Sequence, residues 1–194
     1  MALSENNPDA LEQPVRVLQI IVAAMAMGVL TFLAIVVLLV PRAIVPEGPA
    51  GAGGQGINLG GMQIITLAAL FMGASALVLS NMVPALVVAR GRSQIAREKL
   101  VPDDPSKLPP IAQPTDAGRL LALYQNQLII GAALAEGGAF FSVIAYMLER
   151  HPVALGLAIV LLGSLLIKFP TRDRVAAWLD QQLALVLEER RTGV

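Results

Sequence analysis

Four long runs with almost no charge constrain the fold of this chain more than any motif does. Three runs carry no charge at all, residues 17–40, 62–89 and 153–167, and the run 120–148 carries only Glu136. The fourth is shorter, residues 153–167, and reaches 169 if the Lys168 side chain extends to the membrane surface. A helix needs about 20 mostly apolar residues to cross a hydrocarbon core roughly 30 Å thick. The sequence therefore predicts an all-α, polytopic membrane protein with four transmembrane helices, at 17–40, 62–89, 120–148 and 153–169.

The basic residues between these runs indicate on which side of the membrane each connection lies. Of the 14 Lys and Arg residues, only Arg42 and Arg150 lie in the connections after the first and the third run. All the others precede the first run, lie between the second and third, or follow the fourth. Cytoplasmic loops carry the excess of basic residues in membrane proteins. We therefore expect both termini and the 90–119 connection to be cytoplasmic.

Missing residue types exclude several kinds of site. The chain has no cysteine and one histidine, His151, which excludes a disulfide framework, a thiolate zinc site, a cysteine nucleophile and a conventional catalytic triad. A formal net charge of zero offers no attraction for nucleic acid. We expect no metal, no cofactor and no enzymatic activity, because four membrane helices leave no large soluble domain for catalysis. The polar turn around Glu149, Arg150 and His151 is interpreted as a short connection.

The predicted organisation has two parts. Residues 1–169 form the four-span bundle, which includes a Pro-rich cytoplasmic linker at 100–118, and residues 170–194 form a cytoplasmic amphipathic helix. Five prolines within VPDDPSKLPPIAQPTD rule out a helix in most of that linker. The tail has one stripe at helical spacing, made of Val175, Trp178, Leu179, Gln182 and Val186. This stripe lies either on lipid or a partner, or on the cytoplasmic ends of the bundle itself.

Glu136 is the candidate functional residue, because an ionised carboxylate inside the hydrocarbon is costly and such residues usually face protein. Gln125 lies eleven residues earlier and about 20° from the same helix direction. Ser75, on the second run, is expected at a similar depth if the two runs are antiparallel. Two roles stay open for Glu136: a protonated side chain that forms an interhelical hydrogen bond, or a site that handles a proton or cation. Gly156 and Gly163 indicate a packing face on the fourth run.

Residues 125–148, which include GAALAEGGAFF, resemble the carboxylate helix of the proteolipid subunit c of rotary ATP synthases. The resemblance implies that Glu136 would be the carboxylate that binds a proton or sodium ion. The chain departs from that family in its long linker, its two additional spans and its second run, LAALFMGASALVLS, which lacks the repeated Gly-x-Gly pattern. Separately, GGAFFSVIAYMLE through KFPTRDRVAAWLDQQ is similar to a group of uncharacterised bacterial four-helix integral membrane proteins. That similarity implies a location in the bacterial cytoplasmic (inner) membrane.

Two functional hypotheses follow. In the first, the chain is a non-enzymatic scaffold or accessory subunit of a membrane complex. In the second, it is a proteolipid-like subunit that handles protons or cations through Glu136. Both place the chain in a lipid bilayer and in a homo- or hetero-oligomer with other membrane proteins. The candidate site residues are Glu136, Gln125 and Ser75.

Overall fold

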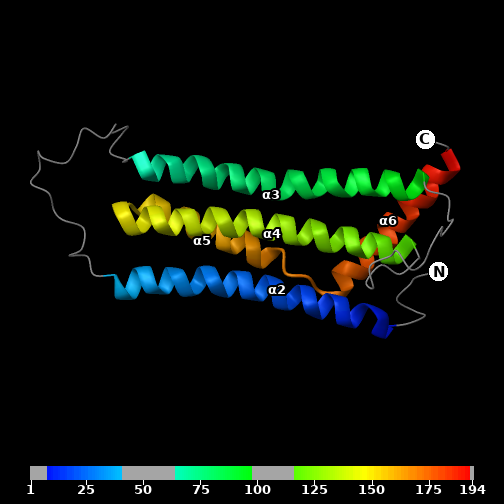
Figure 1. Ribbon diagram of the computed structural model, residues 1–194, viewed down its shortest axis with the longest axis horizontal. Coiled ribbons are helices and arrows are strands. Elements are labelled where there is room, and N and C mark those ends of the chain that lie inside the picture. Colours follow the sequence, from blue (N-terminus) through cyan, green and yellow to red (C-terminus); the bar gives the residue numbers. More distant parts are fainter. Residues whose placement is uncertain (1–7, 41–63, 98–115, 193–194) are drawn as a thin grey trace, which may run out of the picture. The chain divides into compact units, whose positions relative to one another are not determined.

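The computed structural model describes residues 8–40, 64–97 and 116–192, and these residues are helical, with no β-strand among them. In chain order the elements are α2 (Pro8–Ala34), the π-helical turn η1 (Ile35–Leu39), α3 (Ile64–Arg97), α4 (Asp116–Glu149), α5 (Pro152–Ile167) and α6 (Arg172–Thr192) (Figure 1). The predicted all-α class is confirmed for this part of the chain.

Three helical stretches are long and apolar enough to cross a membrane. They are Glu12–Leu39, with 28 residues, and the helices α3 and α4, with 34 residues each. At 1.5 Å per residue, a 34-residue helix is about 51 Å long and extends well beyond a hydrocarbon core of roughly 30 Å. The 16-residue α5 qualifies only when it is counted with α6 as one bent span. Three of the four predicted spans thus correspond to long helices, and the fourth corresponds to a short one.

The helix ends refine the predicted boundaries. Helix α3 continues past the predicted end of the second span, to Arg97. Helix α4 begins at Asp116, so residues 116–118 of the predicted linker are helical. Asp116 lies in the first turn, where the partial positive charge of the helix N-terminus favours an acid. The rest of the linker, 100–115, lies outside the described residues.

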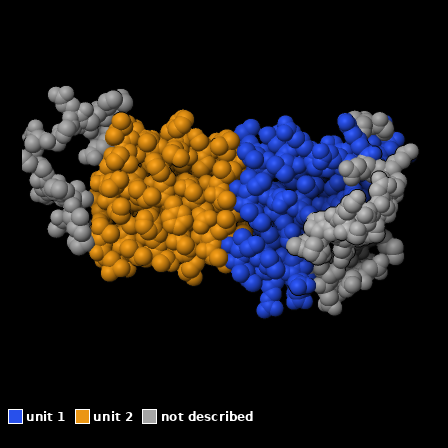
Figure 2. Space-filling view, in the orientation of Figure 1, with its two compact units in different colours: residues 1–21, 81–131, 169–194 blue, residues 22–80, 132–168 orange. Residues whose placement is uncertain are grey.

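The chain divides into two compact units (Figure 2). Unit 1 comprises residues 1–21, 81–131 and 169–194, and unit 2 comprises residues 22–80 and 132–168. Unit 1 contains the tail helix α6 together with segments of α2, α3 and α4.

Small residues form the core of unit 2. Its largest cluster of buried side chains is mostly alanine, with Val29 and three leucines: Ala26, Val29, Ala76, Ala132, Ala135, Ala139, Leu161, Leu162 and Leu165. A Cβ built on Gly73 of α3 would lie 2.5 Å from a methyl carbon of Leu157 on α5, so this glycine permits the leucine to approach. Small residues at membrane helix interfaces let backbones come close and gain dispersion energy there.

Large apolar side chains cover much of the outer surface. Exposed examples include Ile20 at 62%, Phe71 at 76%, Leu38 at 79% and Ile167 at 73% of their full accessible area. Water-soluble monomers rarely expose contiguous apolar patches larger than a few hundred Å². With one exception, Leu187, the exposed large hydrophobic residues fall between residues 17 and 167. This surface and the three long apolar helices indicate a membrane protein.

Unit 1 is built around the apolar stripe of α6. Val175, Leu179 and Val186 are buried with Val15, Ile95 and Leu120, which come from α2, α3 and α4. Trp178 also faces this cluster, and its ring meets that of Tyr124 edge to face with centroids 5.0 Å apart. The predicted stripe is therefore the buried face of α6. Of the two alternatives for the tail, the structure supports packing on protein.

Two interhelical ion pairs fix α6 in unit 1. Arg190 donates two hydrogen bonds to the Asp116 carboxylate, at 2.7 and 3.1 Å, and a third to the backbone oxygen of Ile95. Arg92 Nε donates to Glu189 at 2.8 Å, and its Nη1 donates to Gln182. Both arginine side chains are about three-quarters buried, so these pairs are better shielded from water than ordinary surface pairs.

Candidate functional site

The Glu136 carboxyl lies beside Gly28 of α2. Its Oε1 is 3.8 Å from the position that a Cβ on Gly28 would occupy, and Phe140 Cζ lies 3.7 Å from the same point. Ala132 and Ala139, at i−4 and i+3, are buried. Glu136 itself is half-buried. A methyl group at position 28 would therefore touch this carboxyl at an ordinary van der Waals distance.

Glu136 forms no hydrogen bond or ion pair with any residue that the structure describes. The interhelical hydrogen bond expected of a carboxyl that serves packing is therefore not formed within this part of the chain. A carboxyl of either protonation state needs polar partners when it leaves water. Its oxygens are available to a group from outside the described chain.

The other two candidate residues do not join Glu136. The Ser75 hydroxyl donates to the Phe71 backbone oxygen of its own helix at 2.7 Å, an interaction that satisfies its hydrogen without a neighbouring helix. Gln125 is half-buried and lies about 16 Å before Glu136 along α4, from the helical rise. Within the described residues, neither Ser75 nor Gln125 forms a hydrogen bond with Glu136.

The turn between α4 and α5 is a second polar feature. Its role in capping helices was not predicted from the sequence. The Glu149 carboxylate accepts hydrogen bonds from the backbone N–H groups of Ile65 and Thr66, both at 2.8 Å. These groups belong to the first turn of α3, where helical N–H donors have no partner within the helix. A negative charge there also interacts favourably with the helix dipole. Glu149 is thus a cap for a helix 84 residues earlier in the sequence.

Arg150 caps the C-terminal end of another helical segment, η1. Its Nη2 donates to the Val40 backbone oxygen at 2.9 Å and its Nη1 to that of Val36 at 3.4 Å, at the end of η1. Unpaired carbonyl groups and the negative end of the dipole favour a cation at this position. Arg150 has a φ of 53°, an uncommon conformation for a residue with a side chain. The two hydrogen bonds to Val40 and Val36 hold Arg150 in this strained conformation.

His151 and Pro152 begin the next helix. The His151 Nδ1 accepts a hydrogen bond from Val153 N at 3.4 Å, and Pro152 occupies the first turn of α5, where its missing N–H costs nothing. Consecutive residues of this turn therefore cap α3, η1 and α5. An acid followed by a base at the end of a span is a signal of such capping. The sequence does not reveal which helix ends the two charges meet.

Lys168 also donates a hydrogen bond to a backbone carbonyl, in this case one near Pro84 of α3. Pro84 has no N–H, so the Ser80 carbonyl cannot receive its usual hydrogen bond within α3. The Lys168 ammonium donates to this oxygen at 2.8 Å. The side chain that was expected to extend to the membrane surface is thus bonded to a carbonyl of unit 2.

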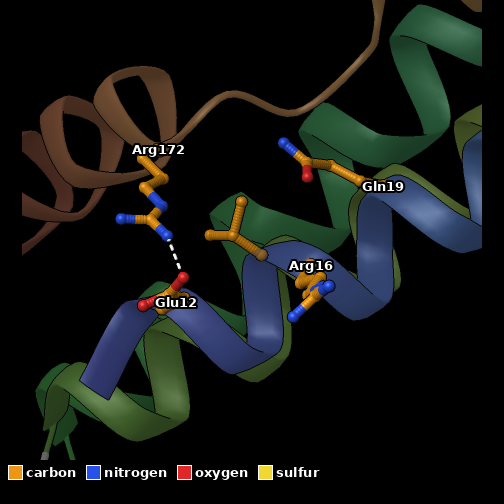
Figure 3. Close-up of a pocket in the computed structure, with 5 residues that line it drawn as sticks. Glu12, Arg16, Gln19 and Arg172 are labelled. Atoms are coloured by element: carbon orange, nitrogen blue, oxygen red, sulfur yellow. Dashed lines mark ion pairs between the residues drawn. The ribbon is translucent and has the colours of Figure 1, made fainter. Parts of the chain in front are cut away.

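Unit 1 contains a small pocket between α2 and the start of α6 (Figure 3). It has a volume of about 150 Å³ and is lined by Glu12, Val15, Arg16, Gln19 and Arg172. Figure 3 shows the Arg172 guanidinium reaching the Glu12 carboxylate, with which it forms an ion pair. Gln19 Nε2 donates to the Pro170 backbone oxygen at 2.9 Å. No pattern in the sequence predicts this pocket.

No three His, Asp or Glu side chains within residues 8–40, 64–97 and 116–192 are grouped as metal ligands would be. No family model matches the chain, and comparisons with curated proteins and with solved structures give no match. Both resemblances described above therefore stay predictions.

Proposed function

We propose that this chain is a non-enzymatic integral membrane protein that serves as a scaffold or accessory subunit of a membrane complex. The observation that carries the proposal is the Glu136 carboxyl, which lies over Gly28 without a polar partner among the described residues. Intramembrane acids usually face protein or a water-filled cavity. A polar side chain on a helix of a partner chain, a second copy or another protein, would supply the missing hydrogen bond.

The proposed topology has four spans, with both termini and the 90–119 connection in the cytoplasm of a bacterial cell. The 12-to-2 distribution of basic residues supports this orientation. Helix α5 has 16 residues and a length of about 24 Å, and spans the membrane together with the residues that follow it. Exposed Val153, Ile159 and Ile167 support contact of α5 with lipid. The location is the cytoplasmic (inner) membrane.

The same carboxyl supports a second candidate function, the handling of a proton or cation. An acid that binds and releases an ion must be reachable and must not be committed to an internal hydrogen bond. Glu136 meets the second condition within the described chain. The two functions differ in what they require, because a packing contact needs a hydrogen-bonding group and ion exchange needs an acid.

Substitutions at Glu136 test the proposal. Glu136→Gln keeps the shape and a hydrogen-bond donor, so the number of chains or partners recovered after mild detergent extraction should match the wild type. Glu136→Leu should weaken assembly by about 0.6 kcal/mol, the average measured for interhelical hydrogen bonds in a membrane. Asn126→Leu is the matched control, because it removes an exposed polar group from the same helix. Equal assembly of the Leu variant and this control would contradict the proposed contact.

Carbodiimide labelling separates the two functions. A hydrophobic carbodiimide reacts with a protonated carboxyl that it can reach in lipid. A partner that covers Glu136 should protect it from labelling in the native complex. Rapid labelling at Glu136 that is slowed by higher pH or by sodium would favour the second function and refute the first.

A further inference from the structure

The pocket in unit 1 is partly open, has two arginines in its lining, and lies on α2 next to exposed apolar residues. Its volume of about 150 Å³ is some ten times the roughly 10–15 Å³ that one water molecule requires by the same measure. The residues that line it include two arginines, Arg16 and Arg172, and one glutamate, Glu12. The side chains that line it thus carry one net positive charge.

We propose that this pocket binds the phosphate group of an anionic lipid. Arg16 is exposed and forms no ion pair within the described residues, so its guanidinium is available to a ligand. Guanidinium groups bind phosphate oxygens through paired, charge-assisted hydrogen bonds. Arg16 is the primary contact because its charge is not already used.

Arg172 is the second contact. It now forms an exposed ion pair with Glu12. The Arg172 and Glu12 side chains keep 57% and 47% of their accessible area. Exposed ion pairs of this kind contribute little to stability, because water screens them. When a phosphate binds both Arg16 and Arg172, the exposed Arg172–Glu12 pair is lost and two charge-assisted contacts to the phosphate form.

The position along α2 favours a lipid over free phosphate. Arg16 directly precedes the uncharged run 17–40. The adjacent Val17 and, one turn further on, Ile20 are exposed, at 47% and 62%. Residues 16 and 20 share one face of the helix, since they are four apart. A lipid phosphate at Arg16 therefore places its acyl chain against this apolar surface. The cytoplasmic leaflet, on which the basic residues place this end of α2, carries the anionic lipids.

This inference rests on the membrane placement in the proposed function and is independent of Glu136. The test uses the full chain in mixed micelles that contain equal amounts of phosphatidylglycerol and phosphatidylcholine with identical acyl chains. Native mass spectrometry then measures how much of each lipid the protein retains. Inorganic phosphate at the same concentration is the second probe.

The wild-type chain should retain phosphatidylglycerol over phosphatidylcholine and should retain no inorganic phosphate. Arg16→Gln should lower the affinity for phosphatidylglycerol about fivefold, the effect of one arginine near an anionic membrane surface. Arg191→Gln, the matched control, removes an exposed arginine from α6 and should change nothing. Glu12→Gln should raise the affinity, because it removes the competing carboxylate and releases Arg172.

Each contrary result has a distinct meaning. Equal lipid retention by the Arg16→Gln and Arg191→Gln variants would overturn the site. Retention of inorganic phosphate as strong as that of phosphatidylglycerol would overturn the assignment to lipid. A Glu12→Gln variant that keeps its helical circular dichroism without gaining affinity would show that the Glu12–Arg172 pair does not compete with a ligand. Release of the chain from membranes by alkaline carbonate would refute the membrane placement and the lipid site with it, whereas loss of the Glu136 contact alone would leave the lipid site intact.

Discussion

Replacing two adjacent glycines of α4 by alanine should change the free energy of unfolding in opposite directions. A Cβ on Gly138 would lie 2.8 Å from the Ala76 Cβ and 3.3 Å from Leu161 Cδ1, whereas a Cβ on Gly137 would meet no atom within 4 Å. Leu161 can change rotamer, but the methyl group of Ala76 cannot. Helices α3 and α4 must therefore move apart in the Gly138→Ala variant.

The magnitude follows from two opposing effects. Alanine in place of an interior helical glycine gains up to about 1 kcal/mol from helix propensity, and both variants share this gain. Overpacking of a tight core costs about 1–3 kcal/mol, and only Gly138→Ala incurs this cost. Gly137→Ala should thus be neutral or up to about 1 kcal/mol more stable. Gly138→Ala should be about 1–2 kcal/mol less stable than the wild type.

Reversible unfolding in mixed micelles of a mild detergent and sodium dodecyl sulfate, followed by circular dichroism, measures both free energies. A third variant isolates the contact, because Ala76→Gly removes the methyl group that the new Cβ would meet. The double variant Gly138→Ala, Ala76→Gly should regain most of the stability that Gly138→Ala loses. Equal free energies for the two single variants, or no recovery in the double variant, would refute the close approach of α3 and α4 at Gly138.

Three further predictions concern topology and capping. Reporter fusions after Gly53 should report the outside and fusions after Val194 the cytoplasm; a cytoplasmic signal at Gly53 would contradict the four-span topology. Glu149→Ala should lower the free energy of unfolding by about 2 kcal/mol, because two backbone N–H groups lose a charged acceptor, and an unchanged value would exclude the cap. Arg190→Ala should raise hydrogen exchange throughout α6 and cost about 1–2 kcal/mol, because a partly buried pair to Asp116 is lost, while Arg191→Ala should leave exchange as in the wild type.

Hydropathy and helical periodicity were sufficient to predict the helices and the buried face of α6. The long uncharged runs correspond to α2, α3 and α4, because burial in lipid requires continuous apolar surface. The spacing of Val175, Leu179 and Val186 predicted one stripe, and all three are buried. Periodicity predicts which side of a helix is apolar. It does not predict what covers that side.

Contacts between distant segments could not be read from the sequence. Gly156 and Gly163 were expected to form a packing face, yet a Cβ on either would meet no atom within 4 Å. Gly28 lies beside Glu136, but no sequence signal pairs the two residues. Glu149 and Arg150 were interpreted only as parts of a polar connection. The helix ends that they cap lie 84 and 110 residues upstream, and no local pattern links such distant positions.

Glu149 and Arg150 are translated after the helix ends that they cap, so both ends are made before their caps exist. Translation adds roughly 5–20 residues per second, so the first turn of α3 precedes its cap by about 4–17 seconds. During that interval the nascent chain carries uncapped N–H groups at one helix end and uncapped carbonyl groups at another. The α4–α5 turn, synthesised later, supplies both caps at once. A chain that stalls before residue 149 therefore lacks the partners of both helix ends.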